Sequence, residues 1–285
     1  MEGISQSLTT QSYATSEGGR FKRERLLLEV LRDPIRSQRE LASSLAVSTS
    51  LVNYLLRRYR VDGTLGEVSL YVASDFLGMV ESHVVCGDGM RGVRGLVLSL
   101  EGESECNYYV VYGESKEDLS IRLRDASVSG KHFFLSYFQD RRPRTPSKFH
   151  LRLLKLMAEI GGANYVEVAR RLGVSLRSVK RHVDFLKGRG AISFLPHVSL
   201  RDGDSRLFTV FTRNPDLVEN LTSKFAVGRL TRGTWTAVWG IAWGEEGERT
   251  LAKVRRVDRD SLVGEYFDLR LEVREAMRRW VLETP

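Results

Sequence analysis

The sequence has few of the residues that build covalent or metal-centred sites. Among its 285 residues are two cysteines, Cys86 and Cys106, too few for a disulfide framework and without the C-x-x-C spacing of a zinc site. The five histidines are scattered, and no glycine-rich nucleotide loop or nucleophile elbow is present. We therefore expect no metal, no cofactor and no catalytic residue, and the sequence predicts that the protein is not an enzyme.

Long apolar runs are also missing, and none approaches the roughly 18–20 residues that a membrane helix needs. The first 19 residues hold two acids and no base and have no apolar stretch, so they do not resemble a secretory signal. Hydrophobic residues nevertheless make up 42% of the chain, enough for a packed core. We expect a soluble cytoplasmic protein that associates with the nucleoid.

Positive charge is concentrated in two segments. The net charge of the chain is +8, and residues 20–65 carry +5 while residues 141–190 carry +10. Residues 66–140 carry −6, and residues 191–285 are close to neutral. Two separate basic segments indicate two contacts with a polyanion, and nucleic acid is the expected partner.

The two basic segments resemble each other. A shift of 127 residues aligns Glu40–Leu65 with Glu167–Ile192 without a gap, and seven positions are identical. The match extends upstream, where Arg-Leu-Leu occurs at 25–27 and again at 152–154. The alignment predicts a duplicated module.

Each copy predicts three helices with a short turn before the third, the arrangement of a helix-turn-helix. In the second copy we expect helices over Phe149–Ile160, from Asn164 to Leu172, and from Leu176 to about Arg189. In the first copy we expect them over Arg23–Leu31, Ser37–Leu45 and from Ser48 to about Arg60. Ser37 with Glu40, and Asn164 with Glu167, have capping-box spacing. The apolar stretches at 191–200 and 205–212 predict two strands that form a wing after the second copy.

The run RLLKLMAEIGGANYVEVARRLGVSLRSVKRHVDFLKGRGAI (Arg152–Ile192) resembles the DNA-binding domain of the feast/famine regulators, the Lrp/AsnC family. The resemblance covers about 45 residues in each copy. It implies a winged helix-turn-helix followed by a small βαββαβ domain for ligand sensing and assembly. A small-molecule effector and a homodimer are therefore expected. The tandem duplication departs from the usual family member, which has one such motif.

The predicted fold is α+β: two winged helix-turn-helix domains, each followed by a small α+β domain of ferredoxin-like or related type. We expect strands at Met79–Cys86 and His132–Phe138, and a short helix or strand at Val93–Leu100. Hairpins are expected from Tyr108–Tyr112 with Leu119–Leu123, and from Thr234–Trp243 with Leu251–Val257. Helices are expected at Asp216–Phe225 and Leu269–Leu282. The domain boundaries are a disordered tail 1–19, helix-turn-helix domains 20–72 and 148–203, α+β domains 73–140 and 204–285, and a linker 141–147.

The expected DNA-binding residues are polar or basic positions on the third helices, with basic residues flanking them. A solvated helix face with no partner is the alternative for each, and it has more weight in the first copy, whose outward face is less basic. In the second copy these residues are Ser175, Arg177, Ser178, Lys180, Arg181, Arg170, Arg171, Lys148 and Arg152. In the first copy they are Ser48, Ser50, Asn53, Tyr54, Arg57 and Arg36.

The function predicted is sequence-specific binding of double-stranded DNA by a transcriptional regulator. A replication initiator or architectural DNA-binding protein is one alternative, and a winged-helix interaction module is another. Some decarboxylases of tetrapyrrole synthesis are similar in fold to the feast/famine regulators, which keeps an enzyme as a further alternative. Trp235, Trp239 and Trp243 share one face of a period-2 segment, which predicts core or subunit interface, with a small-molecule pocket as the alternative.

Overall fold

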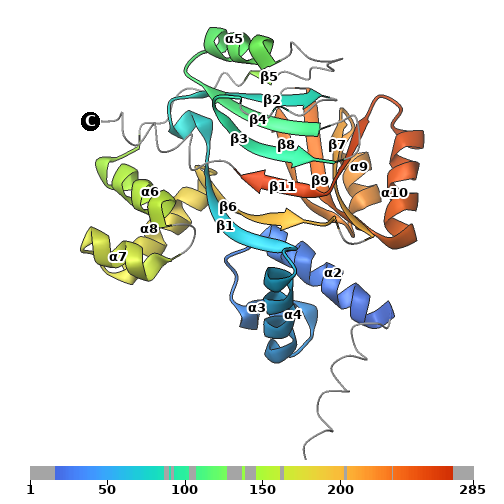
Figure 1. Ribbon diagram of the computed structural model, residues 1–285, viewed down its shortest axis with the longest axis horizontal. Coiled ribbons are helices and arrows are strands. Elements are labelled where there is room, and N and C mark those ends of the chain that lie inside the picture. The colour runs from blue at the N-terminus through green and yellow to red at the C-terminus, as the bar shows by residue number, and fades with distance from the viewer. Residues whose placement is uncertain are drawn as a thin grey trace, which may run out of the picture.

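The protein consists of two three-helix units attached to two β-sheets (Figure 1). The structure is a computed structural model, and it describes residues 17–86, 90, 93–102, 107–126, 137–138, 146–160, 164–201, 204–232 and 234–271. Most of the expected tail and most of the expected linker lie outside these residues. None of the helices in the described ranges is long and apolar enough to cross a membrane.

The first unit contains α2 (Glu17–Arg32), α3 (Gln38–Leu45) and α4 (Thr49–Val61). The capping box at the start of α3 is confirmed, because the Ser37 hydroxyl accepts from the Glu40 amide and the Glu40 carboxylate accepts from the Ser37 amide. Ser48 caps α4 through the Leu51 amide. The expected disordered tail, 1–19, is too long, because residues 17–19 already belong to helix α2.

The second unit repeats this arrangement with α6 (Lys148–Ile160), α7 (Tyr165–Leu172) and α8 (Leu176–Gly188). Asn164 and Ser175 are the N-caps of α7 and α8, as the sequence predicts. Gly173 ends α7 with φ 68°, a left-handed conformation that glycine adopts without steric cost. Both sets of three helices are therefore confirmed.

The wing expected after the second unit is wrong. Strand β6 (Ile192–Ser199) does not pair with β7 (Ser205–Thr212) but with β1 (Leu65–Val72), the strand that follows the first unit. Strand β7 lies between β9 and β10 in the other sheet, so both of its edges are already occupied. The antiparallel β1–β6 ribbon thus joins the two units (Figure 1).

Sheet A is the larger sheet, with the strand order β1-β6-β11-β3-β4-β2-β5. Its remaining strands are β2 (Val80–Cys86), β3 (Leu96–Glu101), β4 (Asn107–Gly113), β5 (Tyr137–Phe138) and β11 (Asp268–Leu271). A 3-10 turn, η1 (Ser74–Phe76), precedes β2. Helix α5 (Lys116–Ala126) covers the outer face of β2 and β4 with the buried side chains of Leu119 and Leu123.

Sheet B has the order β10-β7-β9-β8, with β8 (Ala226–Arg232), β9 (Trp235–Trp243) and β10 (Leu262–Tyr266) completing it. Helices α9 (Pro215–Thr222) and α10 (Gly244–Val257) pack against it. The chain therefore runs β-α-β-β-α-β through this sheet, the ferredoxin-like path. Strands β5, β2, β4 and β3 of sheet A lie in the same relative order.

The inner faces of the two sheets meet, for instance where the Tyr108 and Phe211 rings lie 5.4 Å apart.

Both expected hairpins are wrong. Residues 119–123 belong to helix α5 and 251–257 to helix α10. Leu119, Ile121 and Leu123 alternate as in a strand, but Ile121 is exposed while the other two are buried, which fits one face of a helix. The expected terminal helix is wrong at its start, because Leu269–Leu271 form part of β11 between β3 and β6. The expected strands at 79–86 and 205–212 and the helix at 216–225 are confirmed with small shifts of their ends. Of the two alternatives for 93–100, the strand is the one observed, as β3, and the strand expected at 132–138 lies outside the described residues except for β5 at 137–138.

Candidate DNA-binding surface and interior pocket

Helix α8 presents a basic outer face. Val179, Val183 and Leu186 are buried and fix the rotation of the helix. Arg177, Lys180 and Arg181 are consequently exposed, and Ser178 is partly exposed. The Ser175 hydroxyl accepts from the Ser178 amide, so its first role is to cap the helix. The structure thus brings three basic side chains together on the helix that a helix-turn-helix inserts into the major groove.

The four basic residues that flank α8 in the second unit differ in their contacts. Arg170 and Arg171 both donate to the carboxylate of Glu167, at 2.6 and 2.8 Å. These bonds lower the pKa of Glu167 to about 2, first through Arg170 and then through Arg171. Lys148 and Arg152 on α6 are exposed. Each of the four guanidinium or ammonium groups remains at the surface, where an ion pair is worth little and a phosphate can replace it.

The first unit offers a less basic face. On α4 the exposed predicted residues are Ser50, Asn53, Tyr54 and Arg57, whereas Ser48 is the N-cap. The Arg36 side chain points toward the protein and not toward solvent, because its guanidinium donates to the Glu29 carboxylate at 2.7 Å and to the Glu40 carbonyl at 3.4 Å. The polar side chains Ser50 and Asn53 lie near the start of α4, where a recognition helix meets base edges.

Two histidines that no sequence pattern singles out lie where α6 packs against α8. His150 Nε2 is 3.1 Å from His182 Nδ1, and the ring of Phe149 lies 4.5 Å from that of His182. Burial lowers the pKa of His150, and His182 adds to this effect. The predicted pattern missed the pair because its members are 32 residues apart on different helices.

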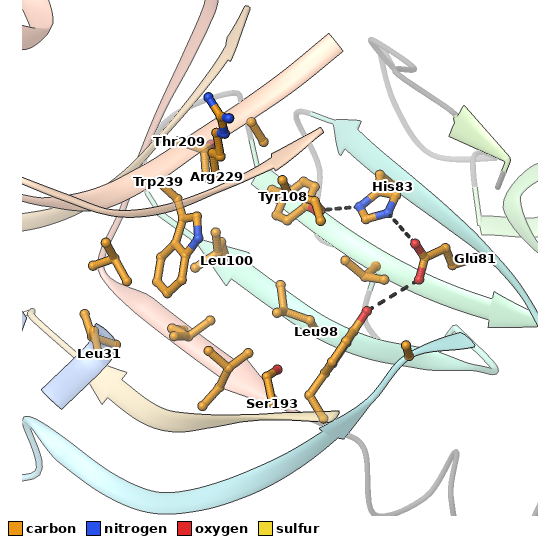
Figure 2. Close-up of a pocket in the computed structure, with 18 of the residues that line it drawn as sticks. Leu31, Glu81, His83, Leu98, Leu100, Tyr108, Ser193, Thr209, Arg229 and Trp239 are labelled. Atoms are coloured by element: carbon orange, nitrogen blue, oxygen red, sulfur yellow. Dashed lines mark hydrogen bonds and ion pairs between the residues drawn. The ribbon is translucent and has the colours of Figure 1, made fainter. Parts of the chain in front are cut away.

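A cavity of about 430 Å³ lies between the inner faces of the two sheets (Figure 2). Its polar end contains Glu81 and His83 from β2 and Tyr108 from β4, joined by hydrogen bonds. No sequence motif marks this group, but Glu81 and His83 are two residues apart on one strand, a spacing that places both side chains on the same face. In the described ranges no group of three or more His, Cys, Asp or Glu side chains has the geometry of a metal site.

The tryptophan segment forms strand β9, and its members have different environments. Trp243 is buried against Phe225, with ring centroids 4.7 Å apart. Trp235 lies under the guanidinium of Arg213 at 4.8 Å. Trp239 lines the cavity between the sheets. The expectation of a core position is confirmed for Trp243, and Trp239 packs against the same core while it lines the cavity.

Comparison with known proteins identifies the second unit. A family model described as winged helix-turn-helix DNA-binding matches residues 146–193. No curated protein matches the chain. Two solved structures are similar at 13% identity, the siroheme decarboxylase NirDL and the same enzyme in complex with an iron-uroporphyrin III analogue. Each similarity covers 92% of this chain, with 97% and 98% of the other chain and TM-scores of 0.48 and 0.46. At this score neither supports an inference about activity. Residues 146–193 therefore match the winged helix-turn-helix domains that bind DNA, and the strand that follows α8, β6, pairs with β1 in place of the expected β7.

Proposed function

We propose that the protein is a sequence-specific double-stranded DNA-binding protein that regulates transcription with two recognition helices, α4 and α8. The observation that carries the proposal is the exposed basic face of α8, formed by Arg177, Lys180 and Arg181, within a domain that matches DNA-binding winged helices. Arginine and lysine on such a helix bind phosphates and the edges of guanine. The proposal assigns no catalytic step to the chain.

The proposal includes a duplicated module related to the feast/famine regulators. Three observations support it: two three-helix units with equivalent caps, the direct pairing of β1 with β6 after them, and four strands in the same order in each sheet. Lys187 of α8 also reaches Asp33 beside α2, at 3.5 Å. One chain then presents two recognition helices in a fixed relation, as a dimer of single-motif subunits does.

The two helices are expected to contribute unequally. Helix α8 exposes Arg177, Lys180 and Arg181 in its first half. Helix α4 exposes Ser50 and Asn53 there, and its exposed arginines, Arg57, Arg58 and Arg60, lie in its second half. Phosphate contacts supply most of the salt-dependent affinity, and hydrogen bonds to base edges supply the specificity. We therefore assign most of the affinity to α8, and to α4 mainly a contribution to base selection.

Selection of bound sequences from a random duplex library tests the proposal. A motif with two half-sites is expected, and the Asn53→Ala variant should lose base preference in one half only. Genomic binding sites clustered at promoters would support a regulator, whereas sites in repeats at a replication origin would favour an initiator. Failure to bind duplex DNA at low salt would refute the proposal and leave a protein-interaction module. Light scattering of the full chain, with and without DNA, tests the expected homodimer.

A further inference from the structure

The cavity between the sheets has two chemically different ends. Figure 2 shows Glu81, His83 and Tyr108 at one end and Leu31 and Trp239 toward the other. The middle is lined by aliphatic side chains, among them Leu98 and Leu100 from β3. A volume of about 430 Å³ lies within the range of small-molecule sites, which are mostly apolar with a few convergent polar groups.

The polar end is a chain of hydrogen bonds with a defined direction. The Glu81 carboxylate accepts from the Ser74 hydroxyl at 2.9 Å and faces the Nε2 of His83 at 3.2 Å. A carboxylate only accepts, so Nε2 carries the proton in this contact. The opposite nitrogen, Nδ1, then accepts from the Tyr108 hydroxyl, 2.6 Å away. The phenol oxygen of Tyr108 thereby acts as a donor toward His83 and presents acceptor lone pairs.

The arginines at the edge of the cavity are directed at protein oxygens. Arg229 forms ion pairs with Glu219 at 3.1 Å and Asp216 at 3.8 Å. Arg32 donates to Glu29 at 2.8 Å and to the Ala226 carbonyl at 2.7 Å. A negatively charged ligand would have to compete for these groups, and it would also approach the Glu81 carboxylate, which is 1% exposed. The polar end thus favours a ligand that donates a hydrogen bond over one that carries negative charge.

We propose that this cavity binds a compact, mostly aromatic small molecule with one O–H or N–H donor, which Tyr108 accepts while Trp239 and the leucines contact the apolar body. The relay from Tyr108 through His83 to Glu81 strengthens this acceptor, because a hydrogen bond supported by a carboxylate polarises the phenol. The proposal concerns the cavity and does not depend on DNA binding by either three-helix unit.

Calorimetric titration of the full chain without DNA tests the proposal with three probes of the same ring system. 2-Naphthol offers a donor, 2-methoxynaphthalene has the same body without one, and 2-naphthoate replaces the donor with a negative charge. We expect saturable binding of 2-naphthol, about fivefold to tenfold tighter than that of 2-methoxynaphthalene, which corresponds to one hydrogen bond. Binding of 2-naphthoate should be weaker still.

Two variants locate the contact. Tyr108→Phe removes the acceptor with little change in shape, and it should abolish the preference for 2-naphthol while 2-methoxynaphthalene still binds. Tyr165→Phe is the control, since this half-buried tyrosine of α7 does not line the cavity, and it should keep the preference. Absence of saturable binding by all three probes would overturn the proposal. Tighter binding of 2-naphthoate, equal binding of 2-naphthol and 2-methoxynaphthalene, or an unchanged preference in Tyr108→Phe would overturn the assigned donor contact.

Discussion

The Glu167 carboxylate oxygen Oε1 accepts from the Nε of Arg171 at 2.8 Å, and the same carboxylate also holds Arg170. This acidic residue therefore pairs with two of the bases that flank α8 and offsets half of their positive charge. Replacing it with glutamine removes the negative charge and releases both guanidinium groups for phosphate. We expect Glu167→Gln to bind duplex DNA several-fold more tightly, with a steeper dependence on salt.

Fluorescence anisotropy with a labelled duplex at several salt concentrations measures this effect. Glu159→Gln is the matched control, because Glu159 is an exposed acid near the end of α6 and its replacement changes the net charge equally. Equal gains in the two variants would show that total charge, and not the release of Arg170 and Arg171, determines affinity.

Two glycines should respond to alanine in opposite directions. A Cβ at Gly240 in β9 would lie 2.1 Å from the Phe225 carbonyl oxygen, a backbone atom that cannot move aside cheaply. Gly240→Ala should cost about 1–3 kcal/mol or more of unfolding free energy. Gly188 in helix α8 has open space around its Cβ position, so Gly188→Ala should gain about 0.5–1 kcal/mol. Urea denaturation of both variants measures the two changes, and a loss for Gly188→Ala would contradict the packing of α8.

We expect the buried carboxylate of Asp268 to stabilise the attachment of β11 to the rest of sheet A. The residue is 1% exposed, and its carboxylate accepts from Ser199 at 2.7 Å and from Arg201 and Arg270. Burial alone would raise the pKa of Asp268, but the bonds from Arg201 and Ser199 lower it overall. Asp268→Asn is expected to cost about 1–3 kcal/mol in urea denaturation at neutral pH. Because the folded pKa is lowered, this contribution is complete above the ordinary aspartate pKa and disappears as the pH falls through the folded value. A loss that stays constant into the acid range would contradict this reading.

The histidine pair in the second unit predicts a different pH window. The pKa of His150 is lowered by burial and by His182, so near the ordinary histidine pKa of about 6.5 the unfolded chain binds more protons than the folded one. Stability should thus be complete above that pH and fall as the pH drops below it. Denaturation midpoints at pH 7.5 and 5.5 measure this loss, which His150→Phe should reduce. The same loss in wild type and variant would show that other groups are responsible.

The helices could be predicted because their signals are local. Ser37 with Glu40, and the caps Ser48, Asn164 and Ser175, lie within one turn of the groups they satisfy. Strand pairing is not local: β1 pairs with β6, and β11 inserts between β6 and β3 from the far end of the described chain. Periodicity indicates which face of a strand is buried but not which strand lies beside it, so the sequence pattern predicts β7 as the partner of β6 where the structure has β1.

The same distinction applies to the two sites. The outward face of α8 follows from the helical period of Val179, Val183 and Leu186, so Arg177, Lys180 and Arg181 could be selected from sequence. The cavity combines Glu81 and His83 with Tyr108 from a neighbouring strand and with Trp239 from the other sheet. Their proximity depends on strand order and on the packing of two sheets, which the sequence pattern does not contain.

The central claim is that α8 binds the phosphates and bases of duplex DNA, and its most direct test is the salt dependence of binding. Affinity for a duplex would be measured from low to moderate salt for the wild type and for the triple variant Arg177→Glu, Lys180→Glu, Arg181→Glu. The control reverses three exposed bases on or beside α10, Lys253, Arg256 and Arg259. We expect the α8 variant to lose more than 100-fold in affinity and about 3 in the slope of log affinity against log salt, as for roughly three phosphates. The control should keep the wild-type slope. Equal slopes and affinities for all three proteins would contradict the account.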